Sequence, residues 1–278
     1  MRPLPRRLQH GEEATVVEHL GELRSRLVVC LITIGVTTGV AFGFHNRILN
    51  WLNRPLPVHN GQKVLPTTIG VAEPFLTSFW VSFWAGLVFA LPIILWQTWG
   101  FFAPAFHHNV QRKVVGFALI AGLLFASGIA FGYYIVLKPA IGFLTNYDSS
   151  HFNILIQAKS YYEFVTLVLI AMGVIFLLPI FVLALARIGI LPADKLRRNR
   201  RLGYVIVAAL AVALPGVDPV TTTLEMIPLM ILFEASIWLA VLFDKRWKRA
   251  AAAREAAWQA EYDDPLDFGG GPFEADAI

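Results

Sequence analysis

The sequence predicts an all-α polytopic membrane protein with six transmembrane helices. Of its 278 residues, 56% are hydrophobic and only 15% are charged, and both values depart from the average soluble domain toward the membrane class. The charged residues also cluster and leave long stretches without Asp, Glu, Lys or Arg, as expected where an ionisable side chain in the bilayer is costly. The net charge of +4 therefore needs no nucleic-acid partner to explain it.

Each predicted span is a stretch that approaches the roughly 20 apolar residues needed to cross the hydrocarbon core as a helix. The fifth is the exception, because its roughly 14 residues would cover only about 21 Å at 1.5 Å per residue. It would tilt little in a locally thinned bilayer or mark a place where the protein is thinner than the membrane. We expect the fifth and sixth helices to be short. The six spans are residues 27–44, 75–99, 114–137, 162–186, 203–216 and 224–243.

The distribution of basic residues predicts the orientation. If the six spans alternate, 18 of the 23 Lys and Arg residues lie on the side of the N-terminus. The positive-inside rule then places both termini in the cytoplasm. We expect three parts: a cytoplasmic N-terminal segment (1–26), the membrane domain (27–243), and a cytoplasmic tail (244–278) that is helical at first and disordered at its acidic, Gly-rich end. The five basic residues on the other side are Arg47, Arg54, Lys63, Lys138 and Lys159.

Polar residues within or beside the predicted spans are candidates for function. Glu234 lies near the middle of the sixth span, where it could act in function or simply tie two helices together as a hydrogen-bonded carboxyl. Asp218 precedes Pro219 and is followed by Thr221, Thr222 and Thr223. These residues could act in function or have the simpler role of capping the turn and the start of the sixth helix. Gln97 could hydrogen-bond across helices.

The sequence carries no signature of a membrane enzyme or a metal site. It contains neither HExxH nor GxSxG, and its single cysteine, Cys30, excludes an intrachain disulfide and a multi-cysteine metal site. The adjacent His107 and His108 would point in different directions on a helix, so we expect loop residues rather than metal ligands. We therefore predict no catalytic residues, no metal and no cofactor.

Four short sequences together resemble the TatC family, the multispanning subunit of the twin-arginine protein translocase. They are HLGELRSRL (19–27), AEPF (72–75), WQTWGFFAPAF (96–106) and LPGVDP (214–219). The resemblance implies a concave arrangement of helices in the plasma membrane of a prokaryote. It also implies a receptor that binds twin-arginine signal peptides and exports folded proteins with the proton-motive force. The expected partners are small single-span subunits similar to TatA and TatB, in a hetero-oligomer surrounded by membrane lipid.

The resemblance also implies roles for particular residues. Glu22 matches the family carboxylate that receives a signal arginine, and such a carboxylate can form a bidentate, charge-assisted pair that lysine cannot reproduce. Other residues of the same cytoplasmic contact region are matched by Arg24, Phe101 and Pro104. The family acid before the sixth span is matched by Asp218, and the acid within that span by Glu234. The matches to the outer loop, which forms a cap in the family, are Pro55, Pro74 and Phe75.

Two positions depart from the family pattern. Val110 stands where the family has a second loop glutamate for the signal arginines, and Leu177 stands where the fourth span has a glutamate.

An alternative of a different class is a small-solute or ion secondary transporter that uses Glu234 and Asp218, with Gln97, along a polar path. The absence of an internal repeat disfavours this alternative.

Overall fold

The computed structural model describes residues 16–59, 62–102, 114–148, 151, 155–188, 192–214 and 218–262, which are almost entirely helical. Pro104 and Val110 lie outside these residues. A two-residue antiparallel pair, β1 (Val58–His59) and β2 (Gln62–Lys63), is the one named sheet in the described ranges. The helices are α1 (Val16–Gly43), α2 (His45–Leu52), α3 (Glu73–Phe102), α4 (Val114–Phe131), the π-helix η3 (Gly132–Val136), α5 (Leu137–Asn146), α6 (Ala158–Ile175), α7 (Leu178–Ile188), α8 (Ala193–Arg198), α9 (Arg200–Ala213) and α10 (Pro219–Tyr262).

Five helical stretches within the described residues are long and apolar enough to cross a membrane. They coincide with the first four and the last of the predicted spans, which are thereby confirmed as long apolar helices. One stretch combines α4, η3 and α5, and another combines α6 and α7 across a break at Phe176 and Leu177. The break precedes Pro179, which has no backbone N–H and is therefore favoured in the first turn of α7. The five stretches are Leu20–Gly43, Glu73–Thr98, Ala118–Asn146, Ala158–Ala186 and Pro219–Lys245.

The predicted fifth and sixth helices turn out to differ greatly in length. The fifth, α9, has 14 residues, as its short apolar stretch predicted. The prediction of a short sixth helix is wrong, because α10 has 44 residues and continues past the apolar segment to Tyr262. The physical reason is that the sequence after Asp244 is rich in Ala, Lys, Arg and Glu, which are strong helix formers, and contains no Gly or Pro to stop the helix before residue 262. The hydropathy of the sequence therefore predicts where the apolar stretch of α10 ends, at about Lys245, and not where the helix ends, at Tyr262.

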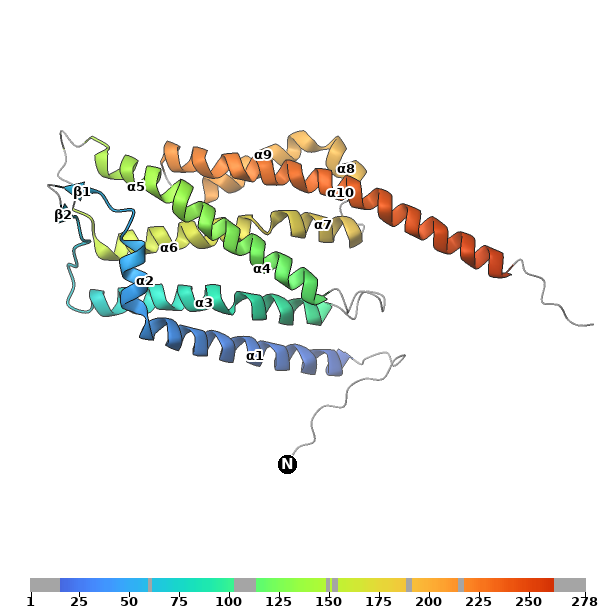
Figure 1. Ribbon diagram of the computed structural model, residues 1–278, viewed down its shortest axis with the longest axis horizontal. Helices are drawn as coiled ribbons and strands as arrows, with labels where there is room; N and C mark the ends of the chain where they lie inside the picture. The colour runs from blue at the N-terminus through green and yellow to red at the C-terminus, as the bar shows by residue number, and fades with distance from the viewer. Residues whose placement is uncertain are drawn as a thin grey trace, which may run out of the picture.

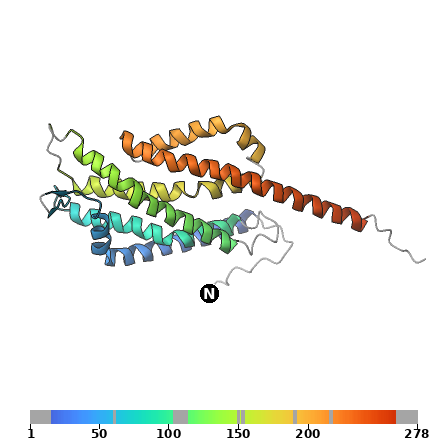
Figure 2. The same cartoon turned by 45° about the horizontal axis from the view of Figure 1, so that its top comes forward.

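The long helices lie roughly side by side and give the molecule two ends, as Figure 1 shows. We call the end that holds the start of α1 and the last turns of α3, α7 and α10 the inner end. The outer end holds α2, β1 and β2. The contacts run from α1 to α3, from α3 to α4 and α6, and through α7 and α10 to α9. In both Figure 1 and Figure 2, α1 and α9 lie at opposite edges of this arrangement.

The tightest packing lies between these two edges. The fully buried side chains include Val136, Leu137, Val165, Met172 and Leu229, which come from η3, α5, α6 and α10. Gly128 allows α4 and α6 to approach closely, because a Cβ atom there would lie 2.5 Å from the carbonyl oxygen of Met172. The edge helices instead expose apolar side chains, as expected for surfaces that face lipid tails. On α1 and α9 these include Leu31, Ile32, Val36, Val205, Ile206 and Val212.

Candidate functional site

Glu22 and Arg26 form a polar site at the inner end, where α1 packs against α3. They lie one helical turn apart, and both the Nε and Nη2 atoms of Arg26 donate to Oε1 of Glu22, at 3.0 Å and 2.5 Å. The Nη1 atom of Arg26 reaches across to α3 and donates to the side-chain and backbone oxygens of Gln97, at 3.2 Å and 3.3 Å. Glu22 and Arg26 are both half-buried. Arg26 therefore orients Glu22 and links the two helices.

The local sequence of α3 makes room for this arrangement. Gly100 faces the Arg26 guanidinium so closely that a Cβ atom at this position would collide with Nη1. Phe101 is half-buried and comes directly after Gly100, so it lies in the same last turn of α3 that faces Arg26. Arg24 is exposed. The structure thus brings Glu22, Gln97 and the Phe101 turn together at one end, and Arg26 rather than Arg24 is the partner of Glu22.

Glu234 lies in a second polar cluster, between α10 and α9. The Tyr204 hydroxyl donates to Oε1 of Glu234, and Nη1 of Arg200 lies 3.5 Å from Oε2. Gly203 permits this approach, because a Cβ atom there would collide with the ring of Phe233 on α10. Arg200 is the first residue of α9, at its inner end, and Glu234 lies near the middle of the apolar stretch Pro219–Lys245, as predicted.

The other polar residues of the predicted spans, Gln97 and the Thr221–Thr223 run, do not lie beside Glu234. Gln97 bonds Arg26 on the other side of the molecule, and the Thr221–Thr223 run lies in the first turns of α10 at the outer end. A helix rises 1.5 Å per residue, so Thr221 and Glu234 are separated by about 20 Å along α10. The distance along α10 therefore separates Thr221 from Glu234, and the packing of α3 against α1 brings Gln97 to Arg26 instead.

Asp218 caps the start of α10. Its Oδ1 atom accepts the backbone N–H groups of Val220 at 3.1 Å and Thr221 at 2.8 Å, as in a standard N-cap. The local capping role that the sequence allowed for Asp218 is therefore present. Thr222 is half-buried in the same turn, and its backbone N–H donates to the Asp218 carbonyl at 3.1 Å.

At the outer end, Glu73 joins the segment before α3 to the segment before α6. Its two oxygens accept the N–H groups of Ile69 (2.7 Å), Gly70 (3.0 Å) and Lys159 (3.1 Å) and the side-chain amide of Gln157 (3.2 Å). A parallel bridge from Thr67 to Gln157 runs alongside. The residues expected in an outer cap lie at this end: Pro55 in the turn after α2, and Pro74 and Phe75 in the first turn of α3, where the Phe75 ring meets Phe42 edge to face at 6.2 Å.

Sequence reasoning missed several residues that the structure makes central. The spacing of four between Glu22 and Arg26 is a helical pairing signal and could have revealed that pair. Arg200 was visible only as part of a basic run, and nothing in the sequence marked Tyr204 or Glu73 as partners of distant groups. Within the described ranges there is no group of three or more His, Cys, Asp or Glu side chains that could hold a metal ion.

Fold and polar sites together define a multispanning, all-helical membrane protein with paired ionic groups at one end and a hydrogen-bonded cap at the other. Comparison with known proteins specifies the family. The family model for the Sec-independent protein translocase protein TatC matches residues 18–228. The chain belongs to the TatC family. It is a translocase subunit and not an enzyme, and this excludes the solute-transporter alternative.

Relatives and solved structures agree over most of the chain. The Sec-independent protein translocase protein TatC of Desulforapulum autotrophicum is 34% identical over 248 residues, which cover 88% of this chain and 90% of that protein. The protein of the same name from Escherichia coli K12 is 34% identical over 227 residues, covering 81% and 87%. A crystal structure of the twin-arginine translocase receptor TatC in DDM superposes with a TM-score of 0.71 at 31% identity, covering 80% of this chain and 99% of that one.

Proposed function

We propose that this TatC-family receptor binds the paired arginines of a signal peptide at the inner end of α1 and α3. The observation that carries the proposal is the unequal use of the two Glu22 oxygens. Oε1 accepts both hydrogen bonds from Arg26, whereas no described residue hydrogen-bonds Oε2. Glu22 is therefore held in place through one oxygen, and the other oxygen can accept from an incoming guanidinium.

The chemistry of this site favours arginine over lysine. A guanidinium presents a planar fork of N–H donors that can bond one carboxylate and a second acceptor at once, whereas an ammonium is a point charge. The second acceptor in many TatC proteins would be the loop glutamate that the family resemblance implies, but this chain has Val110 there. Glu22 is thus the main carboxylate for the signal arginines, with Arg24, Phe101 and Pro104 contributing to the surrounding surface.

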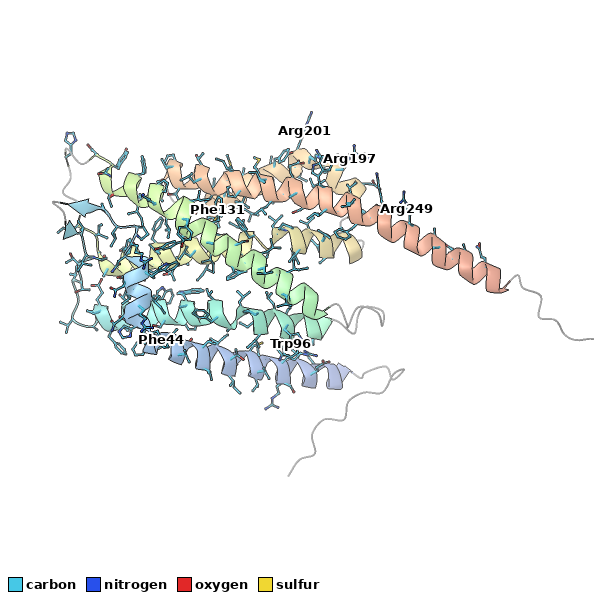
Figure 3. The ribbon with its side chains drawn as sticks, in the orientation of Figure 1. Phe44, Trp96, Phe131, Arg197, Arg201 and Arg249 are labelled. Atoms are coloured by element: carbon cyan, nitrogen blue, oxygen red, sulfur yellow. The ribbon has the colours of Figure 1, made fainter. Side chains whose placement is uncertain are left out.

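The inner end is the cytoplasmic end in this proposal, and α9 is the fifth of six spans. The basic residues support this orientation: Arg197, Arg201 and Arg249 all lie toward the end of the molecule away from Phe44 in Figure 3. Successive long helices run in alternating directions between the two ends in Figure 1. Helix α9 runs from Arg200, on the inner side, to Ala213, toward the outer side, and so fits this alternation as a further span. Both termini would then be cytoplasmic, in the plasma membrane of a prokaryote.

The partners that we propose are small single-span subunits similar to TatA and TatB, assembled with this chain in a hetero-oligomer. The exposed apolar side chains of α9 and the neighbouring α10, including Val205, Ile206 and Ile231, support a lipid-facing surface on which a single helix can pack. The half-buried Glu234 and Arg200 lie on these same two helices and could meet a polar side chain of the partner. Export would use the proton-motive force and no cofactor.

The test is binding of a twin-arginine signal peptide and its twin-lysine version to the purified chain in detergent. Glu22→Gln keeps the size of the side chain and removes its charge, so we expect the affinity for the twin-arginine peptide to fall by about 1–3 kcal/mol. Glu18→Gln, one turn earlier on α1, is the matched control and should leave the affinity unchanged. Equal affinities for Glu22→Gln and the parent chain would overturn the proposal.

A further inference from the structure

A second group of carboxylates, separate from the signal-peptide surface, is buried near the outer start of α10. Glu225 has an exposed fraction of 0%, Thr221 of 0% and Asp218 of 7%. Residues three and four apart share one face of a helix, so the side chains at positions 218, 221 and 225 follow one another along the same side of α10. That side is buried rather than facing lipid, and α10 as a whole packs against α5, η3, α7, α8 and α9.

The oxygens of this group are unusual because they are buried and unpaired. Both carboxylate oxygens of Glu225, the Thr221 hydroxyl and Oδ2 of Asp218 are inaccessible and have no hydrogen-bond partner among the described residues. Two other carboxylates are well satisfied, since Glu73 accepts four hydrogen bonds and Glu234 has both Tyr204 and Arg200. A buried ionised carboxylate without a counter-charge is strongly unfavourable.

Among the described residues, no positive group near Glu225 supplies that counter-charge. On α5, Lys138 is exposed, and on η3 the Tyr133 hydroxyl donates to the Trp51 carbonyl. On α9, Arg200 and Tyr204 serve Glu234 toward the inner end, and the one ionisable residue of α7 is Arg187, in its last turn at that end. Asp218 is the charged group whose field reaches Glu225, and it has the same sign. The charged residues of α8 are Asp194, Lys195, Arg197 and Arg198, which lie at the inner end.

We infer that Glu225, with Thr221 and Asp218, is a proton-binding site within the membrane-spanning part of α10. One proton on Glu225 removes the like-charge repulsion between two neighbouring carboxylates. The protonated carboxyl also gains an O–H donor, and the Thr221 hydroxyl lies one helical turn away on the same face of α10. A single proton thus removes a buried charge that has no counter-charge among the described residues. The inference does not depend on where the signal peptide binds.

The experiment uses an apolar carbodiimide, which reacts with protonated carboxyl groups in apolar surroundings. The carboxyl O–H adds across one C=N bond of the reagent to give an O-acylisourea, which rearranges to a stable N-acylurea on the same glutamate. The intact chain in detergent is treated over a range of pH, with and without Na⁺, and the modified peptides are located by mass spectrometry. We expect label on Glu225 that declines as the pH rises and is unaffected by Na⁺. Glu234, paired with Arg200, is the internal reference and should stay unlabelled.

A second measurement covers the case in which the reagent cannot reach the site. The infrared absorption of a protonated carboxyl should be present in the parent chain and lost in Glu225→Gln, which keeps the side-chain volume. Thr221→Val, which removes only the hydroxyl, should shift the pH at which this band disappears. Absence of both the label and the band would overturn the inference. Protection of Glu225 from the reagent by Na⁺ would also overturn it, in favour of a cation site.

Discussion

Apart from the buried group of Glu225, Thr221 and Asp218, the two ends of the molecule treat their polar groups in opposite ways. At the outer end, buried tyrosines bond the backbone: the Tyr161 hydroxyl donates to the Leu52 carbonyl at 2.7 Å, and the Tyr133 hydroxyl donates to the Trp51 carbonyl at 2.8 Å. Glu73 adds bonds to two further segments. At the inner end, the ionic pairs of Glu22 with Arg26 and of Glu234 with Arg200 are half-exposed and use only part of their hydrogen-bonding capacity.

This difference separates stability from recognition. A buried hydroxyl that bonds a backbone carbonyl fixes the position of a loop, and its loss leaves an unsatisfied group. A half-exposed ion pair contributes little to stability, but it holds a charged group ready for a partner. The outer end therefore closes the bundle, and the inner end presents groups that another chain can bind. A substitution at the outer end should therefore lower stability, and one at the inner end should change binding.

The largest effect should follow from Tyr161→Ala at the outer end. The Tyr161 side chain is 6% exposed, so its removal creates a cavity and also leaves the Leu52 carbonyl without its donor. We expect the free energy of unfolding in detergent to fall by about 3–5 kcal/mol. Tyr161→Phe, which removes only the hydroxyl, should cost about 1 kcal/mol. If the two variants lose equal stability, the ring does not pack as described.

At the inner end, Glu234→Ala should impair assembly while leaving the chain folded and inserted. Its removal deprives Tyr204 and Arg200 of their acceptor, and we expect association with the small single-span subunit to weaken by about 1–3 kcal/mol. Co-purification and export are the measurements. Glu234→Gln keeps an acceptor for Tyr204 and should show a smaller loss. Parent-level insertion, co-purification and export in Glu234→Ala would make Glu234 a bystander.

A smaller effect on stability is expected from Asp218→Ala at the outer start of α10. The substitution removes the acceptor for the N–H groups of Val220 and Thr221, and it should lower the free energy of unfolding by about 1 kcal/mol. Asp218→Asn keeps a capping oxygen and should be close to neutral, as thermal unfolding of the two variants can show. An equal loss in both would mean that the charge, rather than the cap, stabilises this turn.

The smallest effect should come from Val110→Glu, which restores the carboxylate that the family resemblance places in the inner loop. An exposed ion pair contributes about 0.2–1 kcal/mol, so we expect the preference for a twin-arginine over a twin-lysine peptide to grow by that amount. Competition binding with the two peptides measures it, and Val110→Gln is the uncharged control. If Val110→Glu binds both peptides as the parent does, residue 110 is not part of the recognition surface.

The sequence by itself determined the class of protein, the five long spans and the short helix α9. These features depend on local composition, because a helix in lipid needs a fixed number of apolar residues and satisfies its own backbone hydrogen bonds. The motif HLGELRSRL also pointed to Glu22 and to the family through a few neighbouring residues. The length of α10 was misjudged because hydropathy marks where a helix leaves the membrane and not where it ends.

Only the tertiary structure decided which polar groups meet. Arg26 bonds Gln97 across 71 positions of sequence, Tyr204 bonds Glu234 across 30, and the Lys159 N–H reaches Glu73 across 86. Each contact depends on how two segments pack, and for the first two Gly100 and Gly203 allow the close approach. The burial of Glu225 is of the same kind, since the sequence places it on α10 but only the packing of α10 against its neighbouring helices hides it from water. A side chain's neighbours along the chain follow from helix geometry, whereas its neighbours across the bundle follow from close packing of the whole molecule.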